Sequence, residues 1–286
     1  MQQQIDALWD WDDPFGSEAA FREAAEVASA DRERDILLTQ VARAIGLQQR
    51  YGEALEILDG ISVDWDHELS VRTTLERGRI MNSSGDVAAA RPMFEEALAA
   101  ATAAGLENLA VDAIHMAAIV APPLEQAMLN ERAIAMAEAA DDPRARQWLA
   151  SLYNNLGWTR FEAGELDEAL RLFELALSER LRRGEPRETA IARWAVARAL
   201  RAKGQLREAL AMQRKVARSN KAAGVDDPYV DEELGENLLA LGRAAASRRH
   251  FANAAEGLAA DAWLAEHEPE RIERLRQLGA PPPRLP

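Results

Sequence analysis

Apolar residues in positions 153–184 recur with the period of two helices that pack against each other. Four of them share one stripe at helical spacing, namely Leu156, Leu166, Phe173 and Ala176. Gly157 and Ala169 are small where the two helices would cross, and Gly164 stands between the helices, where a turn is needed. The stretch therefore predicts a pair of antiparallel helices.

Similar patterns along the chain predict about six such pairs. The first spans about residues 35–61, the second begins near Val71, and 153–184 is the fourth. The small and apolar positions of the second, fifth and sixth pairs are Gly78, Gly85, Ala90, Phe94 and Ala97; Ala197, Gly204, Ala209 and Val216; and Leu241, Gly242, Phe251, Ala254 and Leu258. With Ala169, Ala209 and Ala254 taken as the crossing residues, the pairs are spaced by 40 and 45 residues.

The third pair is the least regular and leaves the place of His115 open. If Ala127 is the crossing alanine, His115 is buried between helices. If Ala133 is instead the second small residue of the later helix, equivalent to Ala176, His115 faces a groove lined by the first helices of the pairs. We prefer the second register, because Ala133 then aligns with Ala97 and Ala176.

Capping segments are expected at both ends of the array. Residues 1–30 contain a helix capped by Ser17 and running to about Ala28, and we expect Trp9 and Trp11 to pack onto the first helices. The alternative is that this acidic, aromatic segment is a mobile ligand for arginines of its own or another copy. Residues 31–264 would hold the pairs, 265–279 a C-terminal cap and 280–286 a disordered tail, in one continuous domain.

The Leu-Gly, Gly, Ala, Phe and Ala positions of 153–184 resemble the consensus of the tetratricopeptide repeat (TPR). The long spacing resembles the longer-helix variety of that family, as in kinesin light chains, and the whole arrangement resembles uncharacterised bacterial TPR proteins. The resemblance implies an all-α fold, a right-handed α-solenoid whose first helices line a concave groove. It also implies a scaffold that binds peptides or protein termini there.

Charge and composition narrow the classes of partner. The formal net charge of −14 disfavours general binding to nucleic acids or anionic membranes. The absence of cysteine excludes disulfides and thiolate chemistry. No segment approaches ~20 consecutive apolar residues and the N-terminus lacks a signal-peptide pattern, so we expect a cytoplasmic protein.

Superposing the repeats places one residue of each pair at an equivalent position facing the groove. These residues are Arg43, Arg79, His115, Trp158, Arg198 and Arg243. The arginines predict a cationic stripe suited to carboxylates or phosphates. Alternatively, each arginine pairs with an acid on an adjacent helix, such as Glu76 or Glu236, in ordinary ion pairs.

The fourth and fifth pairs concentrate further candidates for binding. Asn154 and Asn155 can pair with a bound peptide backbone, while Trp194 and Arg201 join Trp158 and Arg198 on neighbouring helices. We therefore expect these residues to bind an acidic or carboxylate-bearing protein or peptide. The alternative function is a sensor that binds a small anionic metabolite or signalling peptide.

Signals for catalysis are weak throughout the chain. It has no phosphate-binding glycine loop, no HExxH and no Gly-x-Ser-x-Gly motif. Asp112, His115 and Glu162 form only a weak candidate for a metal site. We expect no enzyme activity, no metal or other cofactor, and no nucleic-acid or membrane partner; a homodimer is possible.

Overall fold

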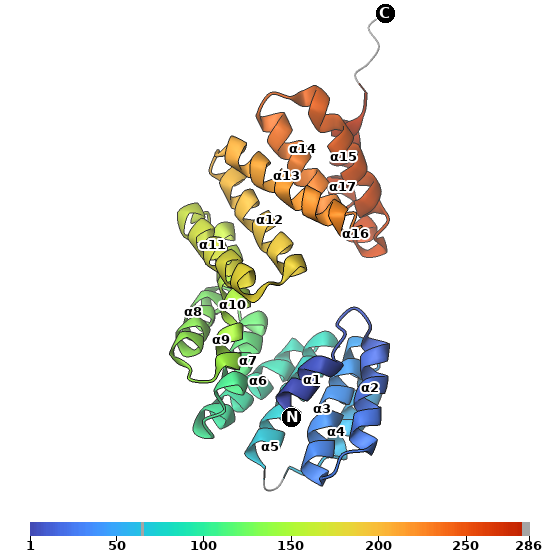
Figure 1. Cartoon of the computed structure of the whole chain (residues 1–286), viewed down its shortest axis with the longest axis vertical. Helices are drawn as coiled ribbons and strands as arrows, with labels where there is room; N and C mark the ends of the chain where they lie inside the picture. The colour runs from blue at the N-terminus through green and yellow to red at the C-terminus, as the bar shows by residue number, and fades with distance from the viewer. Residues whose placement is uncertain (64–65, 282–286) are drawn as a thin grey trace, which may run out of the picture. The chain divides into compact units, whose positions relative to one another are not determined.

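The computed structural model describes residues 1–63 and 66–281, and within these ranges it contains helices and no strand (Figure 1). The helices group into two compact units, residues 1–152 and 153–286. Unit 1 contains α1 (Gln2–Leu8), α2 (Pro14–Glu26), α3 (Asp31–Leu47), α4 (Tyr51–Asp59), α5 (His67–Ser83), α6 (Val87–Ala103), α7 (Glu107–Val120), α8 (Pro123–Ala139), α9 (Pro143–Gln147) and the start of α10 (Leu149–Glu162). Unit 2 contains the rest of α10 and α11 (Leu166–Arg183), α12 (Pro186–Ala202), α13 (Leu206–Ala222), α14 (Pro228–Ala240), α15 (Ala244–Ala259), α16 (Ala262–His267) and α17 (Pro269–Gly279).

Helices adjacent in sequence pack against each other in both units. In unit 1, α6 lies against α5 and α7, and in unit 2, α12 lies against α11 and α13 (Figure 1). Each pair therefore buries its apolar stripe against its sequence neighbours, as in repeat proteins. The predicted all-α class of repeated helical pairs is confirmed.

The turns have the chemistry that the sequence suggested. Gly164 has a φ of 78°, in the left-handed region that favours glycine, and it links α10 to α11 as predicted. Aspartates begin several helices by accepting a hydrogen bond from a backbone amide of the first turn; Asp86 at the start of α6 is one example.

In the second and fourth pairs, the helices cross where a glycine faces a phenylalanine ring. A Cβ atom added to Gly78 would lie 2.6 Å from the ring of Phe94, and one added to Gly157 would lie 2.6 Å from that of Phe173. The crossing predicted at Gly157 and Ala169 is confirmed, because Ala169 and Phe173 are both buried there.

The sixth pair has a different register from the one predicted. Its crossing glycine is Gly235, where an added Cβ would lie 2.7 Å from the Phe251 ring. Gly242 instead follows the end of α14, with a φ of 73°. The buried equivalent of Ala169 is Ser247, 38 residues after Ala209, so the choice of Ala254 was wrong. The Leu241-Gly242 sequence resembles the Leu-Gly of a crossing, but these two residues lie in the turn after the end of α14.

The N-terminal segment also differs from prediction. Asp13, not Ser17, caps α2 and accepts a hydrogen bond from the amide of Gly16 at 2.9 Å. The Ser17 hydroxyl instead bonds the backbone of Asp10. A further short helix, α1, precedes this turn and buries Ile5 in the core of unit 1. At the other end α17 lies within the predicted capping segment 265–279, and α16 begins before it, at Ala262. Residues 282–286 of the expected tail lie outside the described residues.

The crossing contact makes a prediction about stability. Gly78→Ala should destabilise unit 1 by ~1–3 kcal/mol, because its methyl group would overlap the Phe94 ring. Gly52→Ala, in the first turn of α4 with no atom within 4 Å of an added Cβ, should be neutral or stabilising by up to ~1 kcal/mol. Urea denaturation of the two variants measures the difference. Equal midpoints would contradict the assignment of Gly78 to the crossing.

Candidate functional site

Arg43, Arg79 and His115 are contributed by α3, α5 and α7 of unit 1, and Arg79 joins the acids around it into one network. Its guanidinium lies 2.6 Å from a carboxylate oxygen of Glu76 and 2.5 Å from one of Asp112. The Arg79 side chain is only 12% exposed and both acids are buried. Arg79 is thus neutralised within the protein, which supports the structural alternative for this arginine.

Burial and charge act in opposite directions on this network. Burial alone would raise the pKa of Asp112, but the charges of Arg79 and Arg43 outweigh it and hold that pKa below its usual value. Burial lowers the pKa of His115, and the charges of Arg79 and Arg43 lower it further, although Asp112 partly opposes them. The neutral form of His115 is therefore favoured.

The position of His115 agrees with the second of the two registers. Ala133 is fully buried, as its equivalents Ala97 and Ala176 are, whereas Ala127 is partly exposed. The His115 ring lies 5.2 Å from that of Trp148, and its buried Nδ1 has no hydrogen-bond partner among the described residues. His115 thus shares the charged environment of Arg79 instead of packing between paired helices.

The N-terminal segment lies over part of Arg43, whose side chain is 26% exposed and lies 3.9 Å from a carboxylate oxygen of Glu76. The rings of Trp9 and Trp11 stack with their centroids 4.2 Å apart, and the Arg43 guanidinium lies 5.8 and 5.0 Å from them. Trp9 also donates a hydrogen bond from Nε1 to Gln40 of α3 at 3.1 Å. The predicted packing onto the first helices is confirmed for Trp9, whereas Trp11 stacks on Trp9 and lies near Arg43 of α3 but stays 55% exposed.

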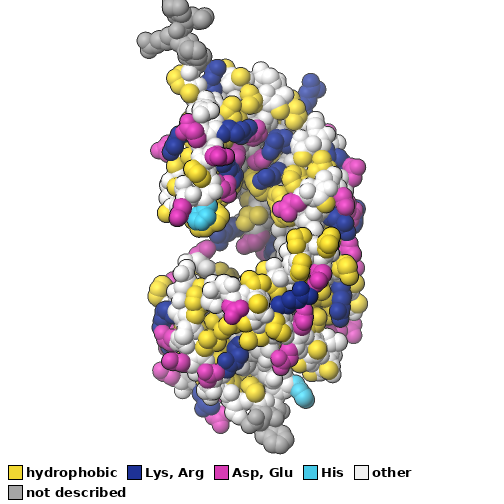
Figure 2. Space-filling view, turned by 180° about the vertical axis from the view of Figure 1, so that it is seen from behind, with side chains coloured by type: hydrophobic (Ala, Val, Ile, Leu, Met, Phe, Trp, Pro, Cys, Tyr) yellow, Lys and Arg dark blue, Asp and Glu magenta, His cyan; other side chains and the backbone are white. Residues whose placement is uncertain are grey.

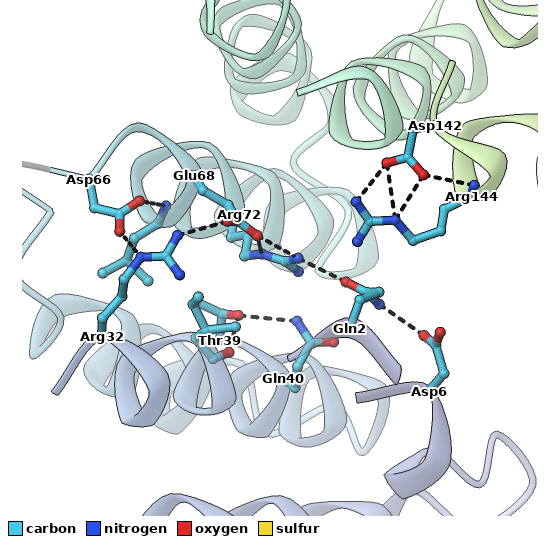
Figure 3. A network of polar contacts seen from close by, with 12 residues as sticks. Gln2, Asp6, Arg32, Thr39, Gln40, Asp66, Glu68, Arg72, Asp142 and Arg144 are labelled. Atoms are coloured by element: carbon cyan, nitrogen blue, oxygen red, sulfur yellow. Dashed lines mark hydrogen bonds and ion pairs between the residues drawn. The ribbon is translucent and has the colours of Figure 1, made fainter. Parts of the chain in front are cut away.

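A polar network fixes α1 to the same helices (Figure 3). Gln2 of α1 accepts a hydrogen bond from Arg72 of α5 at 2.9 Å, and Arg72 pairs with Glu68. Glu68 in turn bonds Arg32 of α3. The N-terminal residues are therefore attached to unit 1 by polar contacts as well as by apolar burial.

In unit 2 the structure brings four of the predicted residues together. The Arg198 guanidinium of α12 lies 5.4 Å from the centroid of Trp158, 5.3 Å from that of Trp194 and 5.8 Å from that of Phe161. We call the surface formed by Trp158, Phe161, Trp194, Arg198, Arg201 and Glu233 the arginine–tryptophan face. It joins α10, α12 and α14, all first helices of pairs.

Arg201 and Arg198 differ in how their charges are compensated. Arg201 forms two hydrogen bonds of 2.7 Å with the buried carboxylate of Glu233, and these raise its pKa. The acid nearest to Arg198 is the same Glu233, at 3.9 Å. Because Arg201 already engages both oxygens of Glu233, Arg198 keeps its terminal N–H groups available and its side chain 35% exposed.

Arg243 does not occupy the predicted position. It lies in the turn before α15, exposed, because α14 ends at Ala240. The equivalent residue on α14 is Glu236, which follows the crossing Gly235 as Trp158 follows Gly157. Glu236 pairs with Arg274 of α17 at 2.6 Å. The predicted stripe therefore ends in an acid, and the error follows from the misplaced register of the sixth pair.

Asn154 and Asn155 lie one turn before Trp158 on α10 and are both partly exposed. Their side-chain amides make no hydrogen bond within residues 1–63 and 66–281. Trp194 donates from Nε1 to the backbone oxygen of Tyr229 at 3.2 Å, which fixes its ring. Sequence reasoning missed Tyr229 and Glu233, although both lie on the next first helix, α14.

The rest of the described surface adds no reactive centre. Figure 2 shows acidic, basic and hydrophobic side chains interspersed over the face that it presents. In the described part of the chain, no three His, Asp or Glu side chains are placed to hold a metal ion. Nor does any helix described there have the length and apolar character needed to cross a membrane.

The lowered pKa values in unit 1 predict how its stability depends on pH. A group whose pKa is lower in the folded than in the unfolded protein binds fewer protons in the folded state. The free energy of unfolding therefore falls as the pH drops below the pKa that the group has in the unfolded protein. His115 should therefore destabilise unit 1 as pH falls below about 6.5, and Asp112 below about 4. Urea denaturation at pH 7.5 and 5.5 should show a smaller loss of stability in His115→Phe than in the wild type. The same loss in both proteins would contradict this role of His115.

Comparison with known proteins gives both a family match and matches in fold. Residues 148–222, which span α10 to α13, match the sequence model of the tetratricopeptide repeat. This match indicates no catalytic family. No relative was found among curated proteins.

Three solved structures illustrate the likeness in fold. A STAND protein with a tetratricopeptide repeat sensor from Pyrococcus horikoshii aligns with a TM-score of 0.70 and 13% identity, over 93% of this chain and 42% of that one. A Rap protein complexed with competence and sporulation factor aligns with a TM-score of 0.57 and 15% identity, over 92% and 79%. TPR-like repeats of a Podosopora anserina protein assigned as a kinesin light chain align with a TM-score of 0.53 and 18% identity, over 68% and 97%. The predicted resemblance is confirmed: the chain is similar to tetratricopeptide repeat proteins, in sequence over residues 148–222 and in fold over most of its length.

Proposed function

We propose that this protein is a binding scaffold and that the arginine–tryptophan face of unit 2 binds a carboxylate of a peptide or protein segment. The helical-repeat fold supports a scaffold, and one neighbour in fold is a Rap protein complexed with competence and sporulation factor. The face lies within the residues that match the repeat family, except for Glu233.

The observation that carries the proposal is the weakly compensated charge of Arg198. Among the predicted arginines that lie on first helices, Arg79 is paired with two acids, Arg201 is paired with Glu233 through both of its oxygens, and Arg43 lies against two tryptophans and 3.9 Å from Glu76. Arg198 has the most exposed side chain of these four, 35% against 26% for Arg43, and its nearest carboxylate among the described residues is that of Glu233, 3.9 Å away. A guanidinium fork in this state can bind an incoming carboxylate through two hydrogen bonds.

The aromatic rings make this arginine a better binding group than an ordinary surface arginine. Contacts with Trp158 and Trp194 restrict the guanidinium, so less conformational entropy is lost when a ligand binds. The rings also offer apolar surface to the ligand beside its carboxylate. Asn154 and Asn155 add free amides that suit a peptide backbone.

A charge reversal tests the proposal. A displayed library of random peptides selected on the full-length protein should enrich sequences with an acidic residue or a free terminal carboxylate. Arg198→Glu should weaken their binding by at least ~10-fold, since a hydrogen-bonded charged pair contributes about 1.5–3 kcal/mol. Fluorescence anisotropy with a labelled peptide measures the affinity.

Arg214→Glu is the matched control for this experiment. It makes the same change of charge at an exposed arginine on α13, the second helix of its pair and outside the arginine–tryptophan face. Because salt screens charges at long range, this variant should bind the peptide with an affinity within ~2-fold of the wild type. Selected peptides that bind the Arg198→Glu and Arg214→Glu proteins equally well would exclude Arg198 from the mechanism.

A further inference from the structure

An open hollow of about 820 Å³ adjoins the arginine–tryptophan face in unit 2. It lies between the first turns of α12, the end of α13 and the start of α14. Trp194 contributes to both the hollow and the face. The other residues that line the hollow and matter below are Ala190, Ile191, Ala223, Val225 and Tyr229.

Exposed apolar side chains gather in this hollow. Ile191 is 56% exposed, Val225 51% and Tyr229 38%, and all three line it. Large apolar side chains are ordinarily exposed singly, and a group of them around one depression marks a binding surface. The hollow therefore has the character of a site for an apolar group.

Three polar side chains at the hollow, those of Trp194, Asn220 and Asp227, are already engaged within the protein. Asp227 caps α14 by accepting hydrogen bonds from the amides of Tyr229 and Val230, and its other oxygen accepts one from Asn220. Trp194 donates its Nε1–H to the backbone of Tyr229. A ligand would find these donors and acceptors occupied. Arg187 and Ser219 also line the hollow, and its exposed apolar side chains offer a ligand burial of apolar surface.

The helix sets the backbone separation of Arg198 and Ile191, a lining residue of the hollow. Ile191, Trp194 and Arg198 follow each other at i, i+3 and i+7 on α12, so they share one side of the helix. Seven residues rise by about 10 Å along a helix axis. An extended peptide covers about the same distance in three residues.

We propose that the hollow binds a large apolar side chain of the same peptide whose carboxylate pairs with Arg198. In the peptide, this apolar residue lies three positions away from the residue that carries the carboxylate. This inference rests on the proposed function, and it adds a sequence requirement to it. The ligand would be an extended segment in which a residue such as Leu, Met or Phe is separated by two residues from an acidic one. The acidic group alone would then not suffice for binding.

A focused library tests the spacing directly. Displayed peptides with one fixed central Asp and random flanking residues, selected on the full-length protein, should enrich large apolar residues at the third position on one side of the Asp. Enrichment at no position, or at another spacing, would overturn the proposal.

Variants of the protein test the hollow. Ala223→Trp should fill it, because Ala223 is exposed at the end of α13, and Ile191→Asn should make its wall polar without entering the core. Each should weaken binding of the selected peptide about tenfold or more, and each should abolish the effect of replacing the apolar residue of the peptide by Ala. Leu181→Asn is the matched control, since Leu181 is 51% exposed but does not line the hollow; it should bind as the wild type does.

Arg198→Gln separates failure of this inference from failure of the proposed function. Weaker binding in Arg198→Gln, Ala223→Trp and Ile191→Asn alike supports both. Weaker binding in Arg198→Gln alone overturns the hollow and leaves the carboxylate site standing. Unchanged binding in all three variants, with unchanged circular dichroism, overturns both.

Discussion

The close contact between a glycine of one helix and a phenylalanine ring of the next is the constraint on which three of the repeated pairs depend, α5 with α6, α10 with α11 and α14 with α15. At Gly78, Gly157 and Gly235 there is no room for even one methyl group. A ring that packs directly on backbone fixes both the distance and the rotation of the two helices, because packed interiors tolerate little change in volume. The residue after each crossing glycine is then placed away from the paired helix, on the side where first helices face each other.

Charges on that side are mostly neutralised inside the protein. Arg79 pairs with Glu76 and Asp112 in unit 1, and Arg201 pairs with Glu233 in unit 2. Arg43 and Arg198 are the two equivalent arginines that lie against a pair of tryptophans instead. In unit 1 the tryptophans come from the N-terminal segment, and the Arg43 side chain is 26% exposed. In unit 2 they come from the repeat helices, and the Arg198 side chain is 35% exposed.

The sequence was sufficient for the fold and for part of the site. The spacing of Gly157, Gly164, Ala169 and Phe173 reflects helix geometry directly, so the pairs could be predicted from it. The sixth pair was misplaced because Leu241-Gly242 in a turn reads like Leu156-Gly157 in a helix, and Arg243 was misassigned with it. The spacing of Gly235 and Phe251 matches that of Gly157 and Phe173, and it was the signal that could have corrected the register.

The compensation of each arginine could not be predicted from the sequence, because it depends on which acid lies within hydrogen-bond distance across helices. Arg198 and Arg201 are three residues apart on one helix, and both approach Glu233. A carboxylate has two oxygens, and Arg201 engages both through a planar fork, so the same acid cannot pair equally well with Arg198. Arg201 therefore acts on the proposed site without touching a ligand: by holding Glu233, it keeps the charge of Arg198 available to a carboxylate from outside.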